Sequence, residues 1–260
     1  MNLHIMTKGR VGNQETLRHI PPDWLGRTYI VCPMSEVDQH LNYHPSVMAE
    51  PHEMNYSQKM QWLIYLIASS GGKGVIMDDD LWWDKRPADK GKYLQRIQDV
   101  NELSRMWSDM EQHLEEVPLC GVQPRMMGQN QPLPYRDIGK VITIQGINTA
   151  LFGTNKIPKV DYDPILADVH LCCYLLSRGL PNRLITDFVV NWKSSQAPGG
   201  CDYRTADMQR EACNRVAEMY PHWATAVTKT PKTVKWLGDT RTDLRVQWKK
   251  LYKDAPNAGT

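Results

Sequence analysis

The chain has 260 residues, of which 41% are hydrophobic and 23% charged, a balance typical of a folded globular protein with a sizeable core. Its formal net charge of +2 excludes a polycation that binds nucleic acid over its whole surface. No apolar run approaches the roughly 18 residues that cross a bilayer, and there is no secretory signal. The six cysteines show no C-x-x-C spacing, which indicates reduced thiols and not a disulfide framework or a zinc site.

Strands and helices alternate over the first 80 residues. Strands are predicted at residues 3–6, 28–31 and 75–77, with helices beginning after Asn13 and at Ser57. A loop rich in His, Asn and Pro covers residues 36–53. This β-α-β-α-β order predicts an α/β fold with a Rossmann-like, mostly parallel central sheet flanked by helices.

The later part of the chain has a more mixed pattern. Residues 87–116 keep helical spacing of apolar residues and predict one long amphipathic helix. The further predicted elements are strands at 118–124, 141–152, 184–192 and 244–248 and helices at 163–177 and 205–219. We expect residues 1–253 to form a single domain and residues 254–260 a flexible C-terminal tail.

Three consecutive aspartates, Asp78, Asp79 and Asp80, follow the buried strand at residues 75–77. Adjacent carboxylates repel one another, and burial without a partner is costly for each. They therefore require a cation, and oxygen ligands in this setting suit Mg²⁺ or Mn²⁺ together with a substrate phosphate. The alternative is a solvated acidic turn, which the apolar residues on both sides disfavour.

Several short motifs share their order and spacing with a known family. An acidic D-x-D at a strand end near residue 80 resembles the nucleotide-sugar glycosyltransferases of the GT-A fold. The wider set is similar to the bacteriophage TET-associated glycosyltransferases, which are thought to add sugars to 5-hydroxymethylcytosine in phage DNA. The matching motifs are Gln14-Glu15-Thr16-Leu17 with Pro21, Met77-Asp78-Asp79-Asp80-Leu81, Gly121-Val122 before Arg125, Gly199-Gly200-Cys201-Asp202-Tyr203-Arg204, Tyr220-Pro221 and Trp248-Lys249-Lys250. The similarity extends from about residue 7 to residue 250.

The resemblance implies a GT-A-like domain with Mn²⁺ or Mg²⁺ bridging the two phosphates of a nucleotide-sugar, which we expect to be a UDP-sugar. On that pattern Asp80 is the direct metal ligand and His222 a late metal ligand. Asp78 faces the ribose or the metal, and Asp79 is assigned to the same donor site.

Other residues are predicted to bind the donor from their positions. Arg10 and Thr16 lie where the first strand meets the first helix, a usual place for nucleotide phosphates. Lys59, with its neighbour Gln58, lies on the helix before the aspartate strand, and could instead be a solvated helix charge. Arg204 is predicted to bind phosphate of the donor or of DNA, the alternative being a surface charge at a helix start.

The resemblance also implies an inverting reaction with one catalytic base. Asp168 aligns with the family's catalytic aspartate, although Ala167 replaces the acidic residue that precedes it. The alternative for Asp168 is a first-turn carboxylate favoured by the helix dipole. Asp161 and Asp163 are weaker candidates, and His170 could be a base, a metal ligand or a structural histidine.

The expected acceptor is DNA with hydroxymethylated cytosine, and the expected location is the host cytoplasm, as a soluble phage-encoded enzyme. Basic residues with interleaved Trp236 and Trp248 between Lys229 and Lys253 suggest a DNA-backbone patch, although such runs are usually solvated. Trp82 or Trp83 could stack on an extruded base. A glycan or protein acceptor, a metal-dependent nuclease or phosphotransferase, and a non-enzymatic DNA-binding module remain alternatives.

Overall fold

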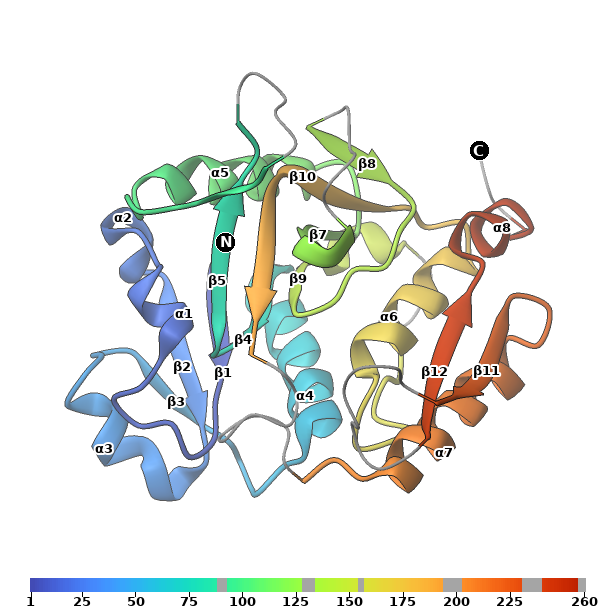
Figure 1. The fold of residues 1–260 in the computed structure, drawn as a ribbon. Coiled ribbons are helices and arrows are strands. Elements are labelled where there is room, and N and C mark those ends of the chain that lie inside the picture. The colour runs from blue at the N-terminus through green and yellow to red at the C-terminus, as the bar shows by residue number, and fades with distance from the viewer. Residues whose placement is uncertain (88–92, 128–133, 154–156, 194–202, 231–239, 257–260) are drawn as a thin grey trace.

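A large mixed β-sheet runs through the molecule (Figure 1). The computed structural model describes residues 1–87, 93–127, 134–153, 157–193, 203–230 and 240–256. Within these residues the sheet order is β3-β2-β1-β4-β9-β7-β10-β5-β6, with β8 also paired to β10. The strands are β1 (Asn2–Met6), β2 (Thr28–Cys32), β3 (Val47–Ala49), β4 (Lys73–Asp78), β5 (Leu81–Lys85), β6 (Gln95–Arg96), β7 (Leu119–Pro124), β8 (Tyr135–Asp137), β9 (Ile144–Asn148) and β10 (Asn182–Trp192).

The N-terminal half of the sheet is parallel, as predicted. Strands β3, β2, β1 and β4 pair in parallel, and so do β7 and β10. In contrast, β9 is antiparallel to both of its neighbours, and β5 is antiparallel to β10. Strand β5 has this direction because it starts directly after β4, and a parallel return needs a crossover of a dozen or more residues.

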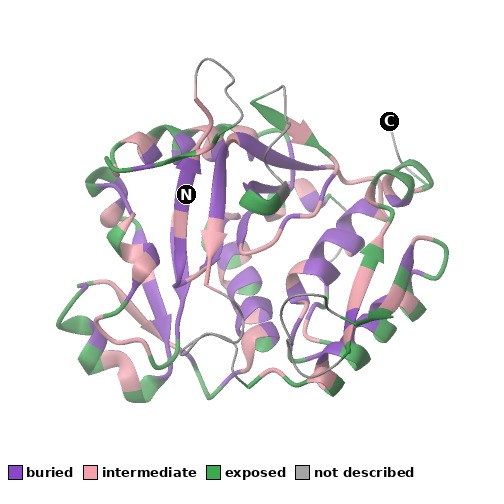
Figure 2. Cartoon of the chain, in the orientation of Figure 1, coloured by how far each residue is buried: buried purple, intermediate pink, exposed green. Residues whose placement is uncertain are grey.

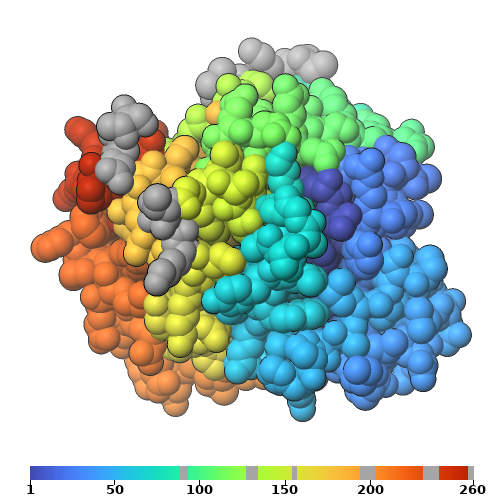
Figure 3. Space-filling model, turned by 180° about the vertical axis from the view of Figure 1, so that it is seen from behind, coloured from blue at the N-terminus to red at the C-terminus, as the bar shows by residue number. Residues whose placement is uncertain are grey.

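Helices cover both faces of the sheet (Figures 1 and 2). Successive residues of a strand point to opposite faces. In β4 Met77 therefore packs in one core with Trp107, on the face of α1 (Glu15–Arg18), α2 (Pro22–Leu25) and α5 (Glu102–His113). Its neighbour Ile76 packs in a second core with Ile64 and Leu171, on the face of α4 (Tyr56–Ser69) and α6 (Ala167–Leu176). Seen from behind, α4 lies on the surface between the N-terminal strands and the region of α6 (Figure 3).

A smaller unit packs on the outer side of α6. It consists of α7 (Ala206–Met219), the antiparallel pair β11 (Ala224–Lys229) and β12 (Arg241–Val246), and α8 (Trp248–Lys253). A third apolar cluster joins Val169 and Leu176 of α6 to Val216 and Leu251. The remaining short elements are α3 (Val37–Leu41) and 3₁₀ turns at Met34–Glu36, Arg125–Met127 and Thr149–Phe152.

Several predicted boundaries are wrong for local reasons. Of the helix predicted over 87–116, residues 88–92 lie outside the described residues, and the described part is helical only in α5, because Asp99 Oδ1 accepts the amide of Asn101 at 3.0 Å and forms a turn before it. The strand predicted to run to Phe152 ends at Asn148, whose side chain accepts the Ala150 amide at 3.1 Å. The strand predicted to end at Trp248 stops at Val246.

The C-terminal region is described up to residue 256 and makes a side-chain contact with the rest of the chain. Asp254, where we expected a flexible tail to begin, accepts a hydrogen bond from Trp223 Nε1 at 2.9 Å. Residues 257–260 of the predicted tail lie outside the described residues. No helix in the described part of the chain has both the length and the apolar character needed to span a membrane.

Candidate functional site

The three aspartates form the turn between β4 and β5, at the edge where β4 ends. Asp79 is 8% exposed and Asp80 is 9% exposed, while Asp78 is half-buried. The alternative of a solvated acidic turn is therefore wrong. The turn lies at the carboxyl end of a central strand, which is the usual position of ligand sites in α/β sheets.

The Asp79 carboxylate accepts hydrogen bonds from two neighbouring side chains. Its Oδ2 accepts the Thr7 hydroxyl at 2.5 Å, and its Oδ1 accepts from Arg10. Gln14 donates to the Thr7 hydroxyl at 2.7 Å and so fixes the loop after β1. Both carboxylate oxygens of Asp79 thus already have partners within the protein, and its predicted contact with the donor stays a prediction.

Arg10 is the cation that the acidic turn requires. Its guanidinium pairs with Asp79 and lies 3.4 Å from Asp80 Oδ2, and its side chain is largely buried. A guanidinium therefore already neutralises one side of the turn, and the expected metal stays a prediction. Arg10 acts first on the aspartates, and its predicted contact with the nucleotide stays a prediction.

Thr16 holds the backbone of the turn in place through hydrogen bonds. Its hydroxyl donates to the Asp78 carbonyl at 2.7 Å and accepts the Leu81 amide at 2.9 Å. Its own amide donates to the Asp79 carbonyl at 3.1 Å. Because Thr16 is fully buried and its hydroxyl is used on both sides, its predicted role in nucleotide binding is replaced by a structural one.

Asp78 and Asp80 are the carboxylates left for a ligand. No hydrogen bond to the Asp78 side chain is found among the described residues. Burial, followed by the charges of Asp80, Asp79 and Asp168, raises the pKa of Asp78 well above its usual range. Burial also raises the pKa of Asp80, although Arg10 and then Lys193 oppose this. Burial raises the pKa of Asp79 to about 6 despite its bonds to Thr7 and Arg10.

Asp168 lies at the start of α6 and faces the acidic turn closely enough for its charge to act on Asp78. One oxygen, Oδ1, accepts the Val169 amide at 2.8 Å. Burial raises the pKa of Asp168, while Lys140, the Val169 amide and Arg204 act in the opposite direction. The fold thus brings together Asp78, Asp168 and Arg204, which are far apart in the sequence.

The other candidate bases near α6 are arranged differently. Asp163 pairs with Arg215 at 3.0 Å and lies 3.6 Å from His170 Nε2. His170 is buried, and burial lowers its pKa. This favours the structural interpretation of His170, and Asp163 is already engaged by Arg215. Asp161 remains a half-buried residue of the segment before α6.

Lys59 is buried on α4, against the loop that follows β1. Its Nζ pairs with Glu50 and donates to the Thr7 carbonyl at 3.0 Å. Gln58 is part of a capping box with Asn55 at the start of α4. The predicted diphosphate contacts of Lys59 and Gln58 are therefore corrected to structural contacts, and the alternative of a solvated charge for Lys59 is also wrong.

His222 does not join the acidic turn. It is exposed after the C-terminal end of α7, edge-on to Trp223 with ring centroids 5.6 Å apart. Arg204 lies at the opposite end of this 14-residue helix, about 20 Å away at 1.5 Å per residue. Within the described residues, no three His, Cys, Asp or Glu side chains gather as a metal site. The prediction of His222 as a metal ligand is corrected on these grounds.

Two lysines were not predicted from the pattern. Lys193 follows β10 and acts on Asp80, and Lys140 acts on Asp168. Lys140 lies in the segment 138–143, whose ends Ile138 and Thr143 have positive φ values of 58° and 62°. Such values are rare for β-branched residues and often occur at functional sites. The one sequence signal for this segment is Gly121, where a Cβ would lie 2.5 Å from Val141.

The two tryptophans after the aspartates have separate roles. Trp83 is fully buried and packs edge-on against Trp107, so it belongs to the core. Trp82 is half-buried on the opposite face, with the Arg96 guanidinium 5.0 Å from its ring centre. Beside it, buried Asp84 accepts from Asn191 at 2.8 Å and lies 3.3 Å from Arg125. Only Trp82 remains available for stacking on an acceptor.

A divalent metal fits part of this arrangement. Mg²⁺ and Mn²⁺ are commonly held by one or two carboxylates, with substrate phosphates and water completing the coordination. Asp78 is unpartnered within the described residues, and Asp80 has only a long contact with Arg10. These two carboxylates fit such a metal when it arrives with a diphosphate. A site built from protein ligands alone does not fit the described residues.

Comparisons with known proteins place the chain in no established family. No family model and no curated protein match it. Among solved structures, it is similar to mannose-1-phosphate geranyltransferase from Thermus thermophilus, with 10% sequence identity and a TM-score of 0.36. That alignment covers 72% of this chain and 58% of the other. A likeness at this level carries no argument about function.

The predicted loop glycines Gly199 and Gly200 lie outside the described residues.

Proposed function

We propose that this chain is a metal-dependent glycosyltransferase that moves a sugar from a nucleotide-sugar, most simply a UDP-sugar, to 5-hydroxymethylcytosine in phage DNA. The observation that carries the proposal is a buried acidic turn with a further carboxylate nearby, that of Asp168, whose charge acts on Asp78. The motif resemblance supplies the substrate classes, and the α/β fold is compatible with them.

Asp168 is the base in this proposal. Its raised pKa makes it a stronger proton acceptor than an exposed aspartate, and Val169 holds one of its oxygens in place. It removes the proton from the acceptor hydroxyl as that oxygen bonds to the anomeric carbon. The bond from this carbon to the diphosphate breaks, and its electron pair leaves with the diphosphate. Attack opposite the leaving group inverts the configuration.

The acidic turn holds the donor side. Asp78 and Asp80 are the residues that hold Mn²⁺ or Mg²⁺, and the metal when bound would neutralise charge on the donor's diphosphate. Arg10 prevents mutual repulsion in the turn, and Thr16 keeps its backbone in register. Lys193 and Arg204 add positive charge near the two carboxylate groups.

The direct test is mass spectrometry of nucleosides from DNA treated with the protein. Duplex DNA containing 5-hydroxymethylcytosine is incubated with Mn²⁺ and a panel of UDP-sugars, and the digest is searched for a nucleoside heavier by one sugar residue. The Asp168→Asn protein is the control. No modified nucleoside with any donor would refute the proposal as stated.

The same reactions separate the alternatives. Strand cleavage of unmodified DNA without any sugar nucleotide would indicate a nuclease. Metal-dependent hydrolysis of a UDP-sugar without transfer to DNA would retain the donor half of the proposal and point to a glycan or protein acceptor.

A further inference from the structure

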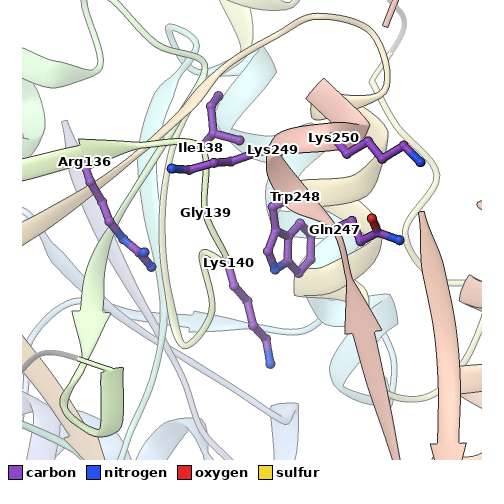
Figure 4. A pocket seen from close by; sticks show the side chains of 8 residues that line it. All are labelled: Arg136, Ile138, Gly139, Lys140, Gln247, Trp248, Lys249 and Lys250. Carbon is purple, nitrogen blue, oxygen red and sulfur yellow. The ribbon is translucent and has the colours of Figure 1, made fainter. Parts of the chain in front are cut away.

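A hollow of about 420 Å³ lies between β8 and the start of α8, apart from the acidic turn (Figure 4). The residues that line it are Arg136, Ile138, Gly139, Lys140, Gln247, Trp248, Lys249 and Lys250. They come from two segments more than 100 residues apart in the sequence. In Figure 4 the side chains of Arg136, Lys140 and Trp248 border one space, Lys249 reaches back toward Ile138, and Lys250 points away.

The lining is strongly basic and has no internal counter-charge. Four of its eight residues are cationic and none is acidic. Within the described part of the chain, none of these four cations forms an ion pair. Two cations elsewhere in the predicted basic tail, Lys229 and Arg241, each pair with Asp243 instead. Lys232, Lys235 and Trp236 of that tail lie outside the described residues.

The wall of the hollow is built to hold its shape. The buried Asn182 accepts the Gly139 amide at 2.8 Å and donates to the Gly139 carbonyl at 2.9 Å. A Cβ at Gly139 would lie 2.4 Å from Leu184 and 3.3 Å from the Arg136 guanidinium, so only glycine fits between them. The Nε of Arg136 is buried without a hydrogen-bond partner among the described residues. The guanidinium makes no hydrogen bond or ion pair to another described residue, so its terminal Nη donors are available to a ligand in the hollow.

We propose that this hollow binds backbone phosphates of the nucleic acid that serves as acceptor, and this inference rests on the proposed function. Arginine and lysine bind phosphate oxygens irrespective of base sequence, and an adjacent tryptophan offers a face for stacking. Arg136 and Lys140 are half-buried donors, and the exposed Lys249 widens the basic surface around them.

The position of the hollow relative to Asp168 fits an acceptor site. Cys172, one turn after Asp168 in α6, donates through its Sγ to the Val141 carbonyl at 3.2 Å, which ties the segment 138–143 to α6. Lys140, directly before Val141, lines the hollow and also acts on Asp168. A backbone held there passes beside the candidate base, from which an extruded nucleotide can reach the acidic turn.

The test is binding of a fluorescein-labelled duplex of about 20 base pairs containing 5-hydroxymethylcytosine, measured by anisotropy over a range of salt concentrations. No donor is added and EDTA is present, so that binding is read separately from transfer. The variant is Arg136→Ala with Lys249→Ala. Its matched control is Arg18→Ala with Arg27→Ala, an equal loss of charge at residues 59% and 54% exposed that lie outside both the hollow and the predicted basic tail.

We expect the Arg136/Lys249 variant to bind at least tenfold more weakly at about 0.1 M salt. The magnitude of the slope of log affinity against log salt concentration should fall by about 1.8, because the variant loses two phosphate contacts and each contributes about 0.9. The control should change affinity less than about twofold, and both proteins should keep the wild-type melting temperature.

Equal affinities for the variant, the control and the wild type would overturn the hollow as the DNA site and leave the proposed function standing. Absence of binding by the wild type would overturn the hollow as well. Normal binding through the hollow without any sugar transfer would support this inference and overturn the proposed function instead.

Discussion

Replacing Arg10 with methionine should destabilise the protein strongly at alkaline pH and much less at acidic pH. Methionine keeps most of the volume and removes the charge that faces Asp79 and Asp80. The Arg10 and Asp79 side chains are only 9% and 11% exposed, so solvent screens this pair little. Removing one partner of a buried pair typically costs about 3–5 kcal/mol.

The pH dependence follows from the raised pKa of Asp79. A carboxyl whose folded pKa of about 6 exceeds its unfolded value of 3.8 binds more protons in the folded state between these values. Stability therefore falls as pH rises through this window, and loss of Arg10 extends the window upward. At about pH 8 we expect a loss near 3 kcal/mol, while at about pH 5 Asp79 is mostly protonated and at least 2 kcal/mol of that loss should disappear.

The assay is urea unfolding followed by tryptophan fluorescence, with EDTA present, at both pH values. The control is Arg18→Met, because Arg18 is 59% exposed and its contact with Glu15 is 3.6 Å long. An exposed pair of this kind is worth less than about 1 kcal/mol at either pH. A loss from Arg10→Met that is equal at the two pH values, or smaller than about 1 kcal/mol at pH 8, would refute the electrostatic account of the turn.

The other predictions concern the hydrogen bonds of Thr16, the proposed base Asp168, and Asp78 and Asp80 as the proposed metal ligands. Thr16→Val should lower the free energy of unfolding by about 1–3 kcal/mol, because the Leu81 amide loses its acceptor. Thr16→Ser keeps the hydroxyl and should retain most of the wild-type stability. Chemical denaturation measures the free energy of unfolding of both variants. Asp168→Asn should lower the transfer rate by about 100-fold or more with donor affinity unchanged, and Asp161→Asn should behave as wild type; equal losses in both would remove Asp168 as the base. In the wild type the rate should decline as acidic pH protonates Asp168, whose pKa is raised. Asp78→Asn and Asp80→Asn should each abolish the rise in melting temperature caused by Mn²⁺ with a nucleoside diphosphate, and an undiminished rise in both would exclude the acidic turn as the metal site.

The sequence pattern predicts the parallel half of the fold well because its strands are short apolar runs and its helix signals are strong. It places β1, β2, β4 and α7 within a few residues, and Thr205 caps α7 through its hydroxyl as such residues do. It does not predict strand direction around β9, since the same apolar run serves either direction. It extends α5 too far because Ile97 is buried directly after β6 and so imitates helical spacing.

Site residues were predictable as chemistry but not as geometry. An acidic turn after a buried strand is visible in the chain, and so is a carboxylate at a helix start. What the pattern cannot reveal is which charges neutralise each other: Arg10 and Lys59 both look like ligand-binding cations, yet each has a buried carboxylate partner. Lys140 has no local signal, because its position depends on left-handed backbone at residues that normally avoid it.

Lys140 belongs both to the basic hollow and to the surroundings of Asp168. An anion held in the hollow screens this lysine, and Asp168 then binds a proton more tightly. By thermodynamic linkage, docking of a polyanion and protonation of Asp168 favour each other. On the proposed function, engaging the polymer would thus raise the already raised pKa of Asp168 further, so that this residue is the strongest base when the acceptor is bound.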